Sequence, residues 1–239
     1  MSGPRRPPGK GGPGKSGPGA RSLTVKVKTA GKRTASSTRW LERQLNDPYV
    51  TEAKRLGYRS RAAFKLAQLD DRFQLIKPGA RVVDLGAAPG GWTQIAAERA
   101  RAREGRGHVV AVDLSPMEPV AGAEILELDF LDPEAPKRIR AALRGPADLV
   151  MSDMAAPATG HPQTDHLRIM ALAEAAYDFA REVLAPGGVF LAKVLRGGTE
   201  RQLLEALKRD FATVRHVKPA ASRADSAEIY VVGTGFRGS

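Results

Sequence analysis

Three carboxylates end three consecutive strand-like runs of this 239-residue chain, and a glycine-rich turn follows the run before them. The acids are Asp113, Asp129 and Asp153, and the turn reads Gly86-Ala-Ala-Pro-Gly-Gly-Trp92. In open α/β sheets, ligands bind beyond the carboxyl ends of the strands. One such acid would be unremarkable. Acids at three strand ends beside a glycine-rich turn indicate a ligand site.

The turn favours a ligand that contains an adenosine but no phosphate. A dinucleotide site needs the pattern G-x-G-x-x-G, with backbone amides directed at a pyrophosphate. This turn reads G-A-A-P-G-G, and Pro89 removes an amide at that point. S-adenosylmethionine (SAM) is a ligand of the required kind. Gly86 is expected to let it approach closely, and Gly90 and Gly91 to open the next helix; the alternative is that all three glycines only serve the turn.

The strand-end acids can then be given separate tasks. Asp113 is expected to accept hydrogen bonds from the ribose hydroxyls, as strand-end acids do in this architecture. Asp129 is expected to accept one from the adenine amino group, and Asp153 to face the sulfonium and the amino group of the methionine. Trp92 either stacks on the cofactor or packs in the core, with packing slightly favoured.

Lys193 stands inside an apolar run, Phe190-Leu-Ala-Lys-Val194, where a buried ammonium is costly unless carboxylates lie nearby or its pKa is lowered. Strand alternation also allows this side chain to extend harmlessly to solvent. Glu228, at the start of the last strand-like run, is either functional or an exposed edge acid. Lys65, on an early helix, is either functional or solvated.

From residue 81 onward, strand-like runs alternate with helix-like stretches, which predicts βαβ units and a mostly parallel, seven-stranded sheet with helices on both faces. A capped helix is also expected over 60–69. The last two strands have no helix between them and are expected to pair antiparallel at one edge. The strands are predicted at 81–85, 108–113, 124–129, 148–153, 188–194, 213–217 and 228–232, and the helices near 91–103, 133–144, 165–185 and 199–210.

The positive charge is concentrated at the start of the chain. Residues 1–40 hold ten Lys and Arg and no acid, whereas the other 199 residues hold 28 bases and 26 acids. The Gly- and Pro-rich residues 1–36 are expected to be disordered, and residues 37–239 to form the folded domain. The tail is either an arm that binds RNA phosphates or a solubilising segment.

Composition excludes several classes of site. The chain has no cysteine, which rules out disulfides and thiolate zinc sites and fits a reducing compartment. His161 and His166 lie five positions apart and do not match a metal motif, so no metal is expected. No apolar run is long enough for a membrane span, and neither a membrane span nor a secretory signal is expected. A cytoplasmic protein without a membrane partner is expected, with a monomer as the default.

Six motifs in order closely resemble the FtsJ/RlmE family of ribosomal RNA ribose 2′-O-methyltransferases, and the resemblance covers roughly residues 37–236. The motifs are Tyr58-Arg-Ser-Arg-Ala-Ala-Phe-Lys-Leu66, Val83-Asp-Leu-Gly-Ala-Ala-Pro-Gly-Gly-Trp-Thr93, Val112-Asp-Leu-Ser-Pro-Met117, Ser152-Asp-Met-Ala155, Leu191-Ala-Lys-Val194 and Ser222-Arg-Ala-Asp-Ser-Ala-Glu-Ile-Tyr230.

The resemblance implies a Rossmann-like, class I SAM-dependent methyltransferase with a Lys–Asp–Lys–Glu tetrad on Lys65, Asp153, Lys193 and Glu228. It implies SAM contacts at Gly90, Trp92, Asp113, Asp129 and Asp153. The implied substrate is a uridine of the A-loop of 23S rRNA, on the large ribosomal subunit.

Two segments depart from the family pattern. The chain has Asp153-Met-Ala-Ala-Pro157 instead of Asp-Met-Ala-Pro-Asn, and Val-Leu-Arg-Gly-Gly198 after Lys193 where Phe-Gln-Gly is common. Both segments are expected to face the substrate, so they bear on the RNA site more than on the reaction.

Lys193 is expected to act on the 2′-hydroxyl, either as a base or as an orienting group. The RNA is expected to be held by Lys54, Arg55, Arg59 and Arg61. The alternatives keep the fold and change the substrate to tRNA or an mRNA cap, or make the protein an rRNA-binding assembly factor that uses SAM structurally. A nicotinamide-dependent oxidoreductase is disfavoured by Pro89.

Overall fold

The computed structural model describes residues 34–157, 159–196 and 201–238, and the chain divides into two compact units, 1–48 and 49–239. The first unit contains helix α1 (Ala35–Leu45), which is capped by the Thr34 side chain accepting a hydrogen bond from the amide of Ser37. The tail predicted at 1–36 lies outside the described residues except for its last three. The remaining elements belong to the second unit, apart from the first residue of α2.

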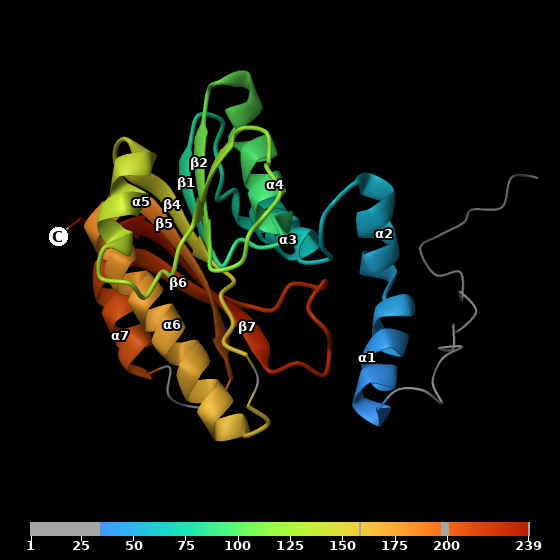
Figure 1. Ribbon diagram of the computed structural model, residues 1–239. Helices are drawn as coiled ribbons and strands as arrows, with labels where there is room; N and C mark the ends of the chain where they lie inside the picture. Colours follow the sequence, from blue (N-terminus) through green and yellow to red (C-terminus); the bar gives the residue numbers. More distant parts are fainter. Residues whose placement is uncertain (1–33, 158, 197–200, 239) are drawn as a thin grey trace, which may run out of the picture. The chain divides into compact units, whose positions relative to one another are not determined.

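A seven-stranded sheet forms the centre of the second unit (Figure 1), in the order β3-β2-β1-β4-β5-β7-β6. The pairs β1–β2, β1–β4, β2–β3 and β4–β5 are parallel, whereas β7 runs antiparallel to both β5 and β6. The predicted sheet with an antiparallel last strand is therefore confirmed. The strands are β1 (Arg81–Leu85), β2 (His108–Asp113), β3 (Ala123–Glu127), β4 (Ala147–Ser152), β5 (Leu184–Leu195), β6 (Phe211–Val217) and β7 (Glu228–Phe236).

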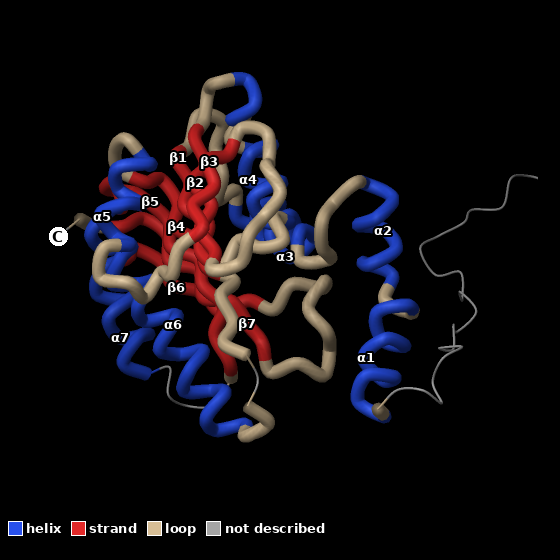
Figure 2. The backbone as a smooth tube through the Cα atoms, viewed as in Figure 1, coloured by secondary structure: helices blue, strands red, loops and turns tan. Residues whose placement is uncertain are grey.

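Helices cover both faces of the sheet (Figure 2). One apolar core joins the sheet to α3 (Ala63–Phe73), α4 (Gly91–Arg99) and the short 3-10 helix η2 (Ala102–Glu104). A second core joins the other face to α5 (Ala135–Leu143), α6 (Pro162–Val183) and α7 (Arg201–Asp210). Helix α2 (Pro48–Leu56) precedes α3. Because both faces are covered, the central strands are continuous apolar runs rather than alternating ones.

Strand alternation decides which core each strand residue joins. In β1, Val83 and Leu85 contact the α5–α7 side, whereas Val82 contacts the α3–α4 side. In β5 and β7, Leu191 and Tyr230 belong to the α3–α4 side. Lys193 is two residues beyond Leu191 in the same strand, so it shares the face of Tyr230.

Three predicted helix boundaries were wrong. Ser60 does not cap a helix: α3 begins at Ala63 without a side-chain cap, after a turn in which the amide of Ala63 donates to the carbonyl of Ser60. The helix predicted from 165 starts at Pro162, because proline suits the first turn of a helix. The stretch predicted at 91–103 is divided into α4 and η2, since Arg101 between them has a left-handed backbone.

Across the described ranges, no helix is both long and apolar enough to cross a bilayer.

Candidate active site

Lys193 is buried, with 8% of its side chain exposed, and it pairs with Asp153. Its Nζ donates to the main-chain oxygen of Asp153 at 2.6 Å and lies 3.2 Å from the carboxylate Oδ1 of the same residue. Asp153 follows β4, the neighbour of β5, and its amide donates to the carbonyl of Leu85 at the end of β1. The sheet therefore places a carboxylate beside the lysine that the apolar strand encloses.

Lys65 pairs with Glu228 in the same region. Its Nζ lies 2.7 Å from Glu228 Oε1, and 11% and 17% of the two side chains are exposed. Lys65 comes from α3, which packs on the sheet through Leu66 and Leu69. Its position next to Leu66 in a short helix gave no sign that its partner would be an acid at the start of the last strand.

Tyr230 joins the two ion pairs. Lys65 Nζ donates to its hydroxyl at 3.1 Å, and the hydroxyl lies 2.8 Å from Asp153 Oδ1 and 3.3 Å from Glu228 Oε1. Burial and the carboxylates of Asp153 and Glu228 raise the pKa of this hydroxyl well above its ordinary value, so it stays protonated. Having a single proton, it donates over the shorter distance, to Asp153.

Strand register explains this arrangement. Lys193 and Tyr230 are directly opposite each other in the β5–β7 pair, and Glu228, two residues before Tyr230, projects from the same face. The structure thus brings the four predicted tetrad residues together. Sequence reasoning missed Tyr230, although a tyrosine two positions from Glu228 in a buried strand needs a partner for its hydroxyl.

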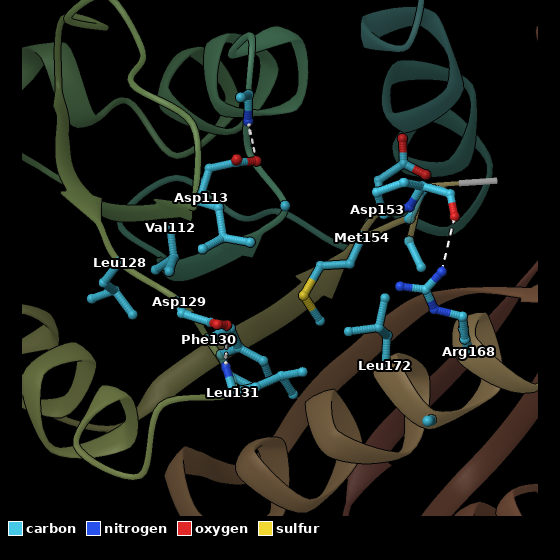
Figure 3. Close-up of a pocket in the computed structure, with 17 residues that line it drawn as sticks. Val112, Asp113, Leu128, Asp129, Phe130, Leu131, Asp153, Met154, Arg168 and Leu172 are labelled. Atoms are coloured by element: carbon cyan, nitrogen blue, oxygen red, sulfur yellow. Dashed lines mark hydrogen bonds between the residues drawn. The ribbon is translucent and has the colours of Figure 1, made fainter. Parts of the chain in front are cut away.

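A cavity of about 530 Å³ opens beside this network at the carboxyl ends of the strands. Asp113 and Asp129 line one part of it, and Arg168 and Leu172 reach it from α6 (Figure 3). Asp153 also lines the cavity, so this residue belongs both to the cavity wall and to the Lys193 pair. Much of the remaining lining is apolar: Val112, Leu114, Leu128, Phe130, Leu131, Met154, Ala155, Ala156 and Pro157.

Asp113 is held rigidly by the loops around it. Its Oδ2 accepts from the amide of Ala88 at 2.9 Å, and its Oδ1 from the amide of Ser115 at 2.8 Å. Asp129 Oδ1 similarly accepts from the amide of Leu131 at 2.9 Å. A carboxylate has about four acceptor positions. Asp113 can therefore still accept two hydrogen bonds from a ligand.

The glycine-rich loop offers few amides to a phosphate. The amides of Gly86 and Ala87 donate to the carbonyl of Val112, that of Ala88 donates to Asp113, and that of Gly90 donates to the carbonyl of Ala87. With Pro89 lacking an amide, the loop amides are almost fully used within the protein. The cavity thus combines fixed carboxylates and apolar walls, and it fits a phosphate-free adenosine ligand with a positively charged centre, such as SAM.

Four of the seven predicted cofactor contacts line the cavity: Gly86, Asp113, Asp129 and Asp153. A close approach of the cofactor to Gly86 stays a prediction. Gly86 also makes room for the protein itself, because a Cβ there would lie 2.8 Å from backbone and side-chain atoms of Met154, in the loop after β4.

Gly90, Gly91 and Trp92 are not among the residues that line this cavity, and their contacts with the cofactor stay predictions. Each of the three also has a packing role within the protein. A Cβ on Gly90 would lie 2.9 Å from the Arg59 guanidinium, and one on Gly91 would overlap Ser60 Oγ. The Trp92 side chain is buried, donates from Nε1 to the carbonyl of Ala62 at 2.9 Å, and packs against the ring of Tyr230. The structure thus gives Trp92 a role in supporting the network.

Two of the four basic residues predicted to hold RNA bind main-chain carbonyls of the protein. The Arg59 guanidinium donates to the carbonyls of Pro89, Glu118 and Pro119, so it fastens the loop after β1 to the loop after β2. Arg61 donates to the carbonyl of Ala221.

The other two predicted RNA contacts are exposed. Arg55 makes two hydrogen bonds to Glu52, and Lys54 lies on the surface of α2. Arg59 and Arg61 thus hold loops near the site in place, and the contact of all four residues with RNA stays a prediction.

Asp84 is a buried acid that the sequence reasoning did not assign. It is 1% exposed, its Oδ2 accepts from Thr93 Oγ1 at 2.7 Å, and its Oδ1 is buried without a hydrogen-bond partner in the described structure. Burial, together with the nearby charges of Asp153 and Asp113, raises the pKa of Asp84 to about 7. Asp84 therefore retains its proton across much of the acidic range.

Within the residues described, no group of three or more His, Asp or Glu side chains is arranged to hold a metal ion.

The sequence pattern of the FtsJ-like methyltransferases matches residues 58–236, which include the whole site. The chain belongs to this family. The chain is 65% identical over 222 residues to "Ribosomal RNA large subunit methyltransferase E" of Paramagnetospirillum magneticum, covering 92% of this chain and 91% of that protein. It is 64% identical over 220 residues to the protein of the same name from Azorhizobium caulinodans, covering 92% of each.

A solved structure supports the same assignment. A protein provisionally assigned as a ribosomal RNA methyltransferase from Plasmodium falciparum superposes with a TM-score of 0.68 at 27% identity, covering 76% of this chain and 100% of that one. The network of Lys65, Asp153, Lys193, Glu228 and Tyr230 is accordingly part of a methyltransferase.

Proposed function

We propose that this methyltransferase transfers a methyl group from SAM to the ribose 2′-hydroxyl of a uridine in the A-loop of 23S rRNA, on the large ribosomal subunit. The observation that carries the proposal is the position of Asp153, which lines the cavity and also pairs with the buried Lys193. The names of the bacterial relatives support large-subunit rRNA as the substrate.

The residues of the cavity suit the parts of SAM. Asp113 would accept hydrogen bonds from the ribose hydroxyls, Asp129 from the adenine amino group, and the apolar walls would contact the adenine. The carboxylate of Asp153 complements the positive charge of the methionine portion. When bound, SAM supplies a methyl group on a positively charged sulfur. After the transfer, the rest of the SAM molecule is a neutral thioether.

Lys193 is the residue proposed to act on the 2′-hydroxyl. Lys193 Nζ donates one hydrogen bond to the main-chain oxygen of Asp153, and the Asp153 carboxylate lies 3.2 Å away as its counter-ion. A remaining N–H of Lys193 would orient the 2′-oxygen for attack, whereas a lone pair on a neutral Nζ would accept its proton. Orientation alone can supply as much as ~7–11 kcal/mol, and general-base catalysis adds on the order of 10²–10⁴-fold.

Lys65 would support the reaction through its charge. Its ammonium, held between Glu228 and Tyr230, is a second cation in the network and would stabilise the negative charge that develops on the 2′-oxygen. All these side chains come from one chain, so the proposal requires only a monomer. A ribosomal substrate would place the protein in the cytoplasm, and the basic segment 1–36 would add sequence-independent affinity for RNA.

Methyl transfer from labelled SAM to isolated large subunits, free 23S rRNA and tRNA, followed by mapping of the modified ribose, tests the proposal. The large subunit is expected to be labelled at one uridine, and Lys193→Ala to abolish labelling. Lys137→Ala, at an exposed lysine of α5, is the matched control and should leave it unchanged. Labelling of tRNA alone would point to another RNA substrate. Binding of rRNA without any labelling would favour an assembly factor.

A further inference from the structure

The loop between β6 and β7, residues 218–227, is attached to the part of the chain that carries Lys65. Arg61 precedes Lys65 by four residues and donates to the carbonyl of Ala221. Gln68 follows Lys65 by three residues, and its Oε1 accepts from the amide of Ala221 at 2.8 Å. Both backbone groups of Ala221 are therefore bound by residues on either side of Lys65.

The residue after Ala221 contacts the site directly. Ser222 is 7% exposed, and its Oγ donates to Glu228 Oε1 at 3.0 Å. The loop around it is also fastened internally. Lys218 Nζ donates to the carbonyls of Ala224 and Ser226 at 3.0 and 2.6 Å, and the Ser226 hydroxyl accepts from the amide of Glu228 at 3.2 Å.

Glu228 Oε1 therefore has three polar neighbours: Lys65 at 2.7 Å, Ser222 at 3.0 Å and the Tyr230 hydroxyl at 3.3 Å. A glutamate side chain has several rotatable bonds, and an ion pair with a flexible lysine leaves many of their rotamers accessible. The Ser222 hydroxyl comes from a loop that is fixed on α3. It therefore restricts the carboxylate to the position from which Lys65 also reaches Tyr230.

We propose that Ser222 is a positioning residue for methyl transfer, acting through Glu228 to hold Lys65 against Tyr230. The proposal rests on the function proposed above for this site. In the described structure, Ser222 lies outside the cavity lining and contacts Glu228 rather than Lys193 or Asp153. Its influence on the reaction therefore passes through one carboxylate.

A double-mutant cycle in the full-length protein tests this route. Ser222→Ala is expected to lower kcat about tenfold, since a hydrogen bond to a charged group is lost. KM for the large subunit and Kd for SAM should stay within about twofold, and Ser222→Thr should restore at least half of kcat, because it keeps the hydroxyl. In a Glu228→Gln background, Ser222→Ala should change kcat less than about twofold. Asp225→Ala, at an exposed residue of the same loop, is the control and should match the wild type.

The free energy of unfolding, measured in urea for the same four proteins of the cycle, is independent of catalysis. Suppose that the stability measurement shows coupling between Ser222 and Glu228, but the wild type methylates no RNA. The proposed function would then be refuted, whereas the positioning of Glu228 by Ser222 would still hold. Absence of this coupling would overturn the inference. With an active enzyme, two further results would overturn it. One is that Ser222→Ala lowers kcat by the same factor in the wild type and in Glu228→Gln, and the other is that Ser222→Ala lowers kcat in neither of them.

Discussion

Replacing Asp84 by asparagine is expected to make the protein more stable, and increasingly so as the pH rises. Asp84 ordinarily ionises near pH 3.8, but in the folded protein burial raises its pKa to about 7. Between these pH values the unfolded chain has released a proton that the folded protein retains. The folded state therefore loses stability relative to the unfolded state as the pH rises from about 4 to about 7.

The size of the effect follows from the two pKa values. They differ by roughly three pH units, and each unit corresponds to about 1.4 kcal/mol, so the full destabilisation approaches about 4 kcal/mol above pH 7. An asparagine side chain at this position would resemble the neutral acid in shape and could still accept the hydrogen bond from Thr93. Asp84→Asn should therefore gain about 1.5 kcal/mol in free energy of unfolding at pH 5 and about 4 kcal/mol at pH 8.

Urea unfolding of the wild type and the variant at several values between pH 5 and 8.5 measures this difference. Asp178→Asn, at an exposed acid of α6, serves as the control and should differ from the wild type by the same small amount at every pH. An Asp84→Asn difference that is equal at pH 5 and pH 8 would show that Asp84 is already ionised in the folded protein, and would refute the reasoning.

Four other predictions concern the network and its surroundings. Lys193→Ala should abolish methyl transfer, with Kd for SAM within a few fold of the wild type; Lys193→Arg should also be inactive, because guanidinium cannot act as a base and has a different shape. Tyr230→Phe should cost about 1–3 kcal/mol in urea unfolding, since Asp153 and Lys65 each lose a buried partner, and should lower kcat at least about tenfold, because Lys65 loses the hydroxyl against which it is held. Arg59→Met should weaken SAM binding about tenfold in calorimetry, because three carbonyls of two cofactor loops lose their donor; unchanged binding would exclude this role. Arg196→Gln, at an exposed cation three residues after Lys193, should weaken RNA binding severalfold and reduce its salt dependence by about one ion, and an unchanged salt slope would exclude a phosphate contact.

Local sequence patterns were sufficient to predict most of the architecture. The alternation of apolar strands and helices determined a mostly parallel sheet, because each pattern reflects which faces of an element are buried. Strand-end acids were predicted to share one edge, and Asp113, Asp129 and Asp153 do line one cavity. The boundaries were less predictable, as at Ser60, because Ser60 lies against Gly91 instead of capping α3.

The type of a residue was not enough to predict which group it contacts. Arg59 and Arg61 were expected to meet RNA phosphates, but their guanidinium groups bind carbonyls of distant loops. Gly90 and Gly91 open α4 as predicted, but the sequence did not reveal that Arg59 and Ser60 fill the space beside them. In each case the residue that makes the contact lies far away in the sequence, so the short residue spacings of helices, strands and turns could not predict it.

By itself, the sequence determined that a lysine in a buried strand would need a carboxylate, since an unpaired ammonium in an apolar interior is too costly. Only the tertiary structure decided how the two ion pairs of the site are linked. It inserts β7 between β5 and β6, which sets Tyr230 opposite Lys193 and within reach of Lys65, 165 positions away. Strand order and register depend on contacts summed over the whole sheet, so no local pattern could have specified this hydroxyl as the link between the two ion pairs.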